Sequence, residues 1–227
     1  MRHNFIRITA CRVCGNRNLV RIVDLGEQYL TGVFPKVVNE EIVVCGNFGD
    51  AAIGCGLLEI MENVHPHLLE IFQNLRLRVL GRNMPSDMLV RVRKATNIEY
   101  YSWIENFDDF IGEADVVLVP DMAGAPGAKT RVVQAMALGA VVVGTRTAFE
   151  GIPLTSGIQG VIYDSAEECA LALINLLGNM ADRHRIGLAA ATLAANEYSL
   201  DRVGPMYEAI YVSAVEKHRR LNVHHHG

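Results

Sequence analysis

Short apolar runs that alternate with helix-like segments are the feature that most limits how this chain can fold. Two of these runs, Val116–Val119 and Val141–Val143, are apolar from end to end, which is typical of strands buried on both faces of a sheet. Helical patterns separate such runs from about Ile42 to about Lys217. The alternation predicts the α/β fold class, as a single open parallel-sheet, Rossmann-like domain with helices on both faces.

We predict three parts along the chain: a small N-terminal cysteine-containing extension (1–41), the α/β domain (42–218) and a tail (219–227). The extension is too short to bury a core of its own. The net charge of -4 gives no support to nucleic-acid binding. No apolar run reaches the roughly 18–20 residues that a transmembrane helix needs. Cysteines in apolar, regular segments indicate a reducing, cytoplasmic location.

Residues 120–139 give the strongest functional signal. A loop of small residues there enters a helix whose first turn is predicted to hold Lys129 and Arg131. Cations are normally unfavourable at a helix N-terminus, so two of them favour a bound anion such as phosphate. The alternative is that both side chains point into water at little cost.

The run from Gly127 to Thr145, followed by Phe149-Glu150-Gly151-Ile152, resembles group 1 glycosyltransferases of the two-Rossmann-domain (GT-B) architecture. Those retaining enzymes often show a glycine, two spaced basic residues, Glu-Ala-Met-Ala and then a valine-rich strand. Ile42–Gly49 resembles the first strand and glycine loop of their C-terminal, donor-binding domain. The resemblance keeps its order over residues 42–217.

The resemblance implies that the domain binds a nucleotide-diphosphate sugar for hexosyl transfer. Gly46 and Gly49 would approach the diphosphate, and Lys129 and Arg131 would neutralise it. The family's glutamate for the ribose hydroxyls is Gln134 here, and an amide lacks the charge-assisted strength of a carboxylate.

Other residues near predicted strand ends are weaker candidates. Glu150 follows the valine-rich strand, where a family carboxylate meets the donor sugar or nucleotide. Trp103 and the Tyr100-Tyr101 pair either pack at a strand end or stack on a base. Asp108 and Asp109 are predicted to cap a short helix. Because the sequence has no Asp-x-Asp motif, we expect no obligatory metal in the chemistry.

Cys11 and Cys14 have the spacing of a zinc knuckle. Residues 11–36 resemble the zinc-binding N-terminal module of sugar C-methyltransferases, in which a second cysteine pair completes the site. Cys45 and Cys55 are candidates for that pair, although their flanking residues favour a buried strand and a helix. A structural zinc ion is the cofactor that the sequence leaves open.

Three functions follow from these observations. The first is a glycosyltransferase domain that binds a nucleotide-diphosphate sugar. Because about 40 residues before Ile42 are too few for an acceptor-binding half, we expect the domain to be incomplete on its own, with a homodimer or partner domain covering the cleft. The second is a non-catalytic module for a nucleotide sugar or a protein. The third is a fragment of a zinc-containing sugar methyltransferase.

Overall fold

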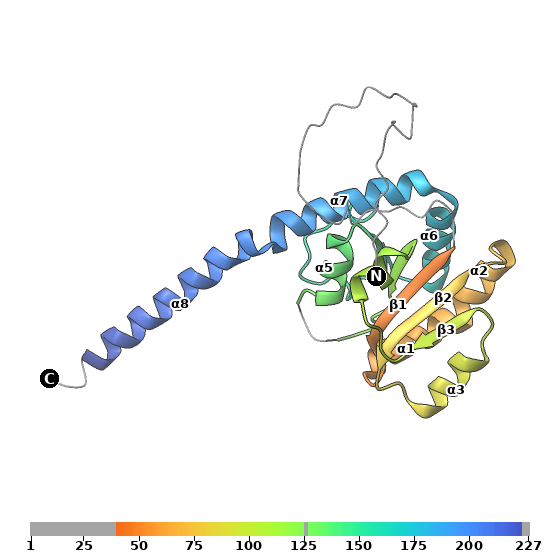
Figure 1. Ribbon diagram of the computed structural model, residues 1–227, viewed down its shortest axis with the longest axis horizontal. Coiled ribbons are helices and arrows are strands. Elements are labelled where there is room, and N and C mark those ends of the chain that lie inside the picture. Colours follow the sequence, from red (N-terminus) through yellow and green to blue (C-terminus); the bar gives the residue numbers. More distant parts are fainter. Residues whose placement is uncertain (1–39, 125–126, 224–227) are drawn as a thin grey trace, which may run out of the picture. The chain divides into compact units, whose positions relative to one another are not determined.

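The computed structural model describes residues 40–124 and 127–223, without the side chains of residues 219–223 (Figure 1). In chain order its elements are β1 (Glu41–Asn47), α1 (Ala51–Glu59), the π-helical η1 (Ile60–Val64), α2 (His65–Ile71), β2 (Arg76–Arg82), α3 (Ser86–Lys94), β3 (Ile98–Tyr101), α4 (Phe107–Gly112), β4 (Val116–Val119), α5 (Thr130–Ala137), β5 (Val141–Thr145), β6 (Val161–Tyr163), α6 (Ala166–Gly178), α7 (Met180–Tyr198) and α8 (Leu200–Val223).

The strands form one sheet in the order β3-β2-β1-β4-β5-β6. Every neighbouring pair is parallel, which confirms the predicted open parallel sheet. The strand order reverses direction between β1 and β4. Ligands of such sheets bind outside the carboxyl ends of the strands near this switch point.

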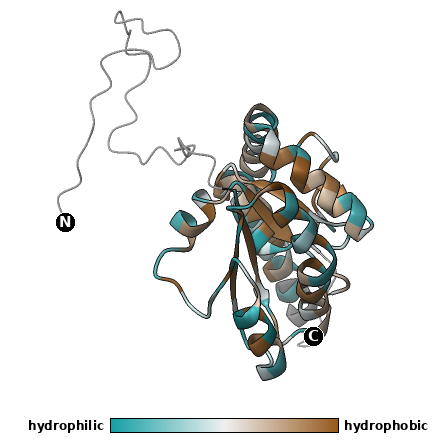
Figure 2. Cartoon of the chain, turned by 90° about the vertical axis from the view of Figure 1, so that its right-hand side faces the viewer, coloured by the Kyte–Doolittle hydropathy of each residue, from teal (hydrophilic) through white to brown (hydrophobic). Residues whose placement is uncertain are grey.

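Two apolar layers cover the two faces of the sheet, and the strands between them consist mainly of hydrophobic residues (Figure 2). One layer contains residues of α1, η1, α2, α3 and α6, such as Leu57 and Leu173. The other contains residues of α4, α5 and α7, such as Ile111 and Met136. Successive strand residues point to opposite faces, so Val44 joins the first layer and Cys45 joins the second.

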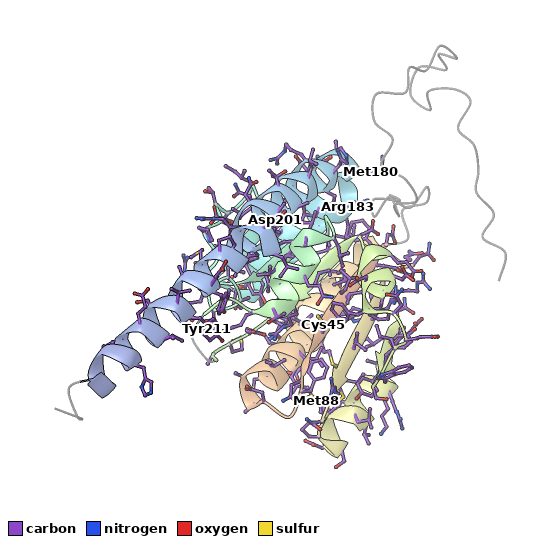
Figure 3. The ribbon with its side chains drawn as sticks, turned by 60° about the vertical axis from the view of Figure 1, so that its left-hand side comes forward. Cys45, Met88, Met180, Arg183, Asp201 and Tyr211 are labelled. Carbon is purple, nitrogen blue, oxygen red and sulfur yellow. The ribbon has the colours of Figure 1, made fainter. Side chains whose placement is uncertain are left out.

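Helix α7 fixes the position of α5. Gly139 ends α5 with a left-handed φ of 76°, as the sequence predicts for a helix stop. Gly187 of α7 lies so close to it that an added Cβ would be 2.2 Å from the Gly139 oxygen. Arg183 of α7 also pairs with buried Asp115, at 3.1 Å, just before β4 (Figure 3).

One local prediction was wrong. Asn106 caps α4 by accepting from the backbone amides of Asp108 and Asp109, so these aspartates lie in the first turn instead of capping it. Elsewhere, η1 leads into α2, whose first turn contains Pro66, a position where proline is tolerated. The side chains of residues 204–218, in α8, are all exposed.

Candidate functional site

A groove of about 780 Å³ opens at the carboxyl ends of β1, β2 and β3 and at the start of α5. This is the edge of the sheet where the parallel topology places ligands. It is lined by Cys45, Gly46, Asn47, Leu80, Gly81, Arg82, Asn83, Ser102, Trp103, Ile104, Phe107, Gly127, Ala128, Lys129, Thr130 and Arg131. The groove therefore brings together three of the four residues predicted to contact the diphosphate: Gly46, Lys129 and Arg131.

The β1 end of the groove is built from backbone that approaches closely. An added Cβ at Gly81 would lie 2.0 Å from the Gly46 oxygen, so only glycine fits there. Gly49 does not line the groove, and an added Cβ would lie 2.9 Å from Cβ of Asn83. Asn83 itself has a φ of 57° and donates to Asn47 Oδ1 at 3.0 Å. Gly49 therefore supports the turn that shapes the groove.

The start of α5 carries the cationic end of the groove. Lys129 is the N-cap residue of α5, and its Nζ lies 3.3 Å from the Gly127 oxygen. The Arg131 side chain is 22% exposed and pairs through Nη2 with both carboxylate oxygens of Asp121. Asp121 is 2% exposed, and its carbonyl accepts a hydrogen bond of 2.6 Å from Thr145 Oγ1.

The Asp121–Arg131 pair changes the charge expected at this end. Both cations were predicted to face an external anion, but Asp121 supplies an internal anion for Arg131. Burying an unpaired carboxylate is costly, so Asp121 requires Arg131. Arg131 still lines the groove, and its Nε is buried without a hydrogen-bond partner among the described residues.

Gln134 lies one turn after the groove-lining Thr130 on α5. Its Nε2 donates to Asp108 Oδ1 at 2.8 Å, joining α5 to α4. Neither Gln134 nor Asp108 lines the groove, although the adjacent Phe107 does. Asp108 is exposed. The sequence showed Gln134 as a departure from the family but gave no signal for its partner.

Aromatic residues form the other end of the groove, and the structure separates the two predicted alternatives. Tyr100 donates to the Gly81 carbonyl at 2.9 Å, and Tyr101 packs edge-on against Phe110 at 5.2 Å between ring centroids. The tyrosines therefore pack. Trp103 is 74% exposed and lines the groove, so its ring is open to a ligand.

Glu150 lies outside this groove. It lines a separate hollow of about 360 Å³ with Arg146, Thr147, Phe149, Ile152, Leu154 and Ile162. Its neighbour Gly151 packs against the loop before α5, where an added Cβ would be 2.9 Å from the Ala128 nitrogen. The Glu150 turn thus supports the loop that leads to the cationic end.

Comparison with known proteins identifies the family. The family model described as "Glycosyl transferases group 1" matches residues 39–179, more than half of the 227 residues. The chain belongs to the group 1 glycosyltransferases. The matched part of the chain contains every element from β1 to α6, and so the whole groove. No curated protein matches the chain.

Solved structures share the fold of this chain at low sequence identity. S. aureus TarM, in a complex that includes UDP, is 12% identical with a TM-score of 0.63, over 86% of this chain and 38% of that chain. Anabaena HepE in complex with UDP-glucose is 13% identical with a TM-score of 0.58, over 77% and 49%. This chain therefore spans less than half of either structure.

A third structure corresponds to a single domain. The C-terminal domain of LpcC, a group 1 family protein from Francisella tularensis, is 16% identical with a TM-score of 0.56, over 70% of this chain and 86% of that chain. Together with the family match, these likenesses confirm the predicted GT-B C-terminal domain.

The described cysteines do not form a metal site by themselves. Cys45 lies within β1 and Cys55 on α1, as their flanking residues indicated. Burial raises the pKa of the Cys45 thiol to about 11, partly offset by nearby Arg131, whereas Cys55 is exposed. Within residues 40–124 and 127–223 no group of three metal-ligating side chains occurs. Cys11 and Cys14 lie outside these residues.

Over the part of the chain that the structure describes, every helix is too short or too polar to cross a bilayer.

Proposed function

We propose that the groove binds the nucleoside diphosphate of a hexose donor, and that the domain takes part in transferring the hexose to an acceptor. The observation that carries the proposal is the groove itself. At the switch edge of the sheet it joins a cationic end, at a helix N-terminus, to an aromatic end. A nucleoside diphosphate has the same two-ended chemistry.

The cationic end suits a diphosphate. Backbone amides at a helix start and the helix dipole attract anions. Lys129 adds an ammonium group, and Arg82 adds a guanidinium group from the end of β2. Gly46 brings the β1 backbone to the same place without a side chain in the way.

The aromatic end suits a nucleobase. The exposed ring of Trp103 provides a stacking face, and Ile104 and Phe107 provide apolar surface beside it. Stacking of a base on an aromatic ring contributes roughly 1–3 kcal/mol. The TarM and HepE structures contain UDP and UDP-glucose, which supports uridine as the first base to test and a hexose as the donor sugar.

In the proposed reaction, negative charge develops on the diphosphate as its bond to the sugar breaks. Fixed cations and backbone dipoles aimed at that charge lower the barrier, because they need not reorganise during the reaction. Lys129 and Arg131 would fill this role, with Arg131 held in place by Asp121. Glu150 would act indirectly, by supporting the loop before α5.

We further propose that the acceptor site belongs to another domain or another protein molecule. The chain covers most of a structure described as a C-terminal domain but less than half of TarM or HepE. The cytoplasmic location is likewise a proposal from the sequence. A sugar methyltransferase fragment would depend on residues 11–36, which lie outside the described residues.

Isothermal titration with UDP, GDP and their hexose conjugates tests the proposal. We expect measurable binding of one nucleotide, weakened by Lys129→Ala but not by Lys94→Ala, an exposed lysine at the end of α3. Absence of binding at millimolar concentrations of every nucleotide would contradict the proposal. A non-catalytic module would bind the nucleotide sugar but neither hydrolyse nor transfer it when supplied with acceptors.

A further inference from the structure

Neither the cationic end nor the aromatic end of the groove accounts for the ribose of a nucleoside diphosphate. In a nucleoside diphosphate the ribose lies between the phosphates and the base. In the protein, α5 carries the cationic end and the segment before α4 carries Trp103. The two helices meet through the hydrogen bond between Gln134 Nε2 and Asp108 Oδ1, at 2.8 Å. This bond therefore joins the elements that flank the expected ribose position.

Gln134 lies on the same face of α5 as a residue that lines the groove. Gln134 follows Thr130 by four residues, so both lie on the same face of α5. Helical side chains lean toward the N-terminus of their helix, and the N-terminus of α5 is at the groove. On α4, Asp108 directly follows Phe107, which lines the groove.

The hydrogen bond also determines which groups face a ligand. The Gln134 amide nitrogen donates to Asp108, so the pair offers carboxylate oxygens and the amide oxygen as acceptors. Adjacent sugar hydroxyls are donors, and their bonds to a carboxylate are the stronger, charge-assisted kind. Gln134 is an amide at the position where the family resemblance expects a carboxylate. The Asp108 carboxylate is hydrogen-bonded directly to that amide.

We infer that Asp108 is the carboxylate that accepts hydrogen bonds from the ribose hydroxyls of the bound nucleotide, and that Gln134 positions it. The assignment rests on the proposed function. Asp108 determines the preference for ribose over deoxyribose, and Gln134 holds its carboxylate at the α4–α5 boundary.

The test compares the affinities of the full chain for UDP and 2′-deoxy-UDP, by titration calorimetry. We expect the protein to bind UDP about tenfold more tightly, since hydrogen bonds to a charged group are worth roughly 1.5–3 kcal/mol. Asp108→Asn should bring this ratio to about twofold or less, with a much smaller loss of affinity for 2′-deoxy-UDP, which keeps only the 3′-hydroxyl, than for UDP.

Asp109 provides the matched control. It is an exposed carboxylate in the same turn, but its Oδ2 accepts from Asn106 Nδ2 at 2.7 Å. In Asp109→Asn the ratio of UDP affinity to 2′-deoxy-UDP affinity should stay within about twofold of its value in the unaltered protein. The double variant Asp108→Asn with Gln134→Glu moves the carboxylate across the hydrogen bond and keeps a donor opposite it. This exchange should restore most of the ratio.

Two results would overturn the assignment while leaving the proposed function intact. One is UDP binding with the same ribose preference in Asp108→Asn as in the unaltered protein. The other is an equal loss of affinity for both nucleotides, as a purely structural α4–α5 tether would give. If the unaltered protein bound GDP instead of UDP, the same comparison would be made with GDP and 2′-deoxy-GDP; if it bound neither UDP nor GDP nor their hexose conjugates, the proposed function would fail, and the assignment with it.

Discussion

The two ends of the groove are built in opposite ways. At the cationic end, the buried Asp121 carboxylate holds Arg131, and Thr145 bonds to the backbone of Asp121. At the aromatic end, Trp103 is exposed, and so is Asp108, which directly follows the groove-lining Phe107. Buried, paired charges contribute to folding as well as to binding. Exposed side chains can be substituted with little effect on folding. Substitutions at the aromatic end can therefore alter nucleotide selectivity without altering the free energy of unfolding.

Arg131→Ala should give the largest effect, because it leaves the Asp121 carboxylate buried without its partner. We expect the free energy of unfolding to fall by roughly 3 kcal/mol, measured by urea denaturation. Replacing both partners with apolar residues of similar size, Arg131→Met with Asp121→Leu, should recover most of the stability but not the nucleotide binding. If Arg131→Ala lowered the free energy of unfolding by less than about 1 kcal/mol, the cationic end would contribute no more to folding than the exposed aromatic end.

Lys129→Ala should separate binding from folding at the same end. Lys129 is partly exposed and its Nζ donates to the Gly127 backbone oxygen, so we expect the free energy of unfolding to change by less than about 0.5 kcal/mol. The UDP affinity should fall about tenfold, with a weaker dependence on salt, because one charge-assisted contact is lost. Titration calorimetry at two salt concentrations measures both effects. The same salt dependence in Lys129→Ala as in the unaltered protein would rule out a phosphate contact.

Trp103→Ala should weaken UDP binding about fivefold, since stacking on an exposed ring is worth about 1 kcal/mol. Trp103 is the only tryptophan of the chain, so its fluorescence should change when UDP is added to the unaltered protein. Trp103→Phe keeps a stacking face and should retain most of the affinity. If fluorescence stays constant while calorimetry records binding, the base lies elsewhere.

The smallest effect concerns pH. Burial raises the pKa of Cys45 to about 11 from its ordinary value of 9.0, so the unfolded chain releases this proton first. The contribution of Cys45 to stability is therefore complete below pH 9 and declines as pH rises toward 11. Urea denaturation at pH 8 and 10 should show the decline, and Cys45→Ala should reduce it. Exposed Cys55 offers the comparison, since Cys55→Ala should leave the decline unchanged.

Local patterns were enough to predict the fold and the edge of the sheet at which the groove opens. The apolar runs at β4 and β5 identified buried parallel strands, and a parallel sheet has one edge where ligands bind. The basic residues at the start of α5 then indicated which loop to consider. Each step depends on residues that are close in sequence.

The partners of the predicted residues were not visible in the sequence, because tertiary contacts decide them. Asp121 reaches Arg131 across a loop in which Gly124 and Gly127 have positive φ angles. Asp108 reaches Gln134 from a different helix, 26 positions earlier in the chain. No periodicity encodes either contact.

The contact between Gly187 and Gly139 has a consequence for binding at the opposite end of α5. It anchors the C-terminal end of this short helix to α7, while its N-terminal end faces the groove. The orientation of the helix dipole is therefore set when the protein folds. The entropy of ordering that part of the groove is lost during folding, so a ligand that enters later does not have to supply it.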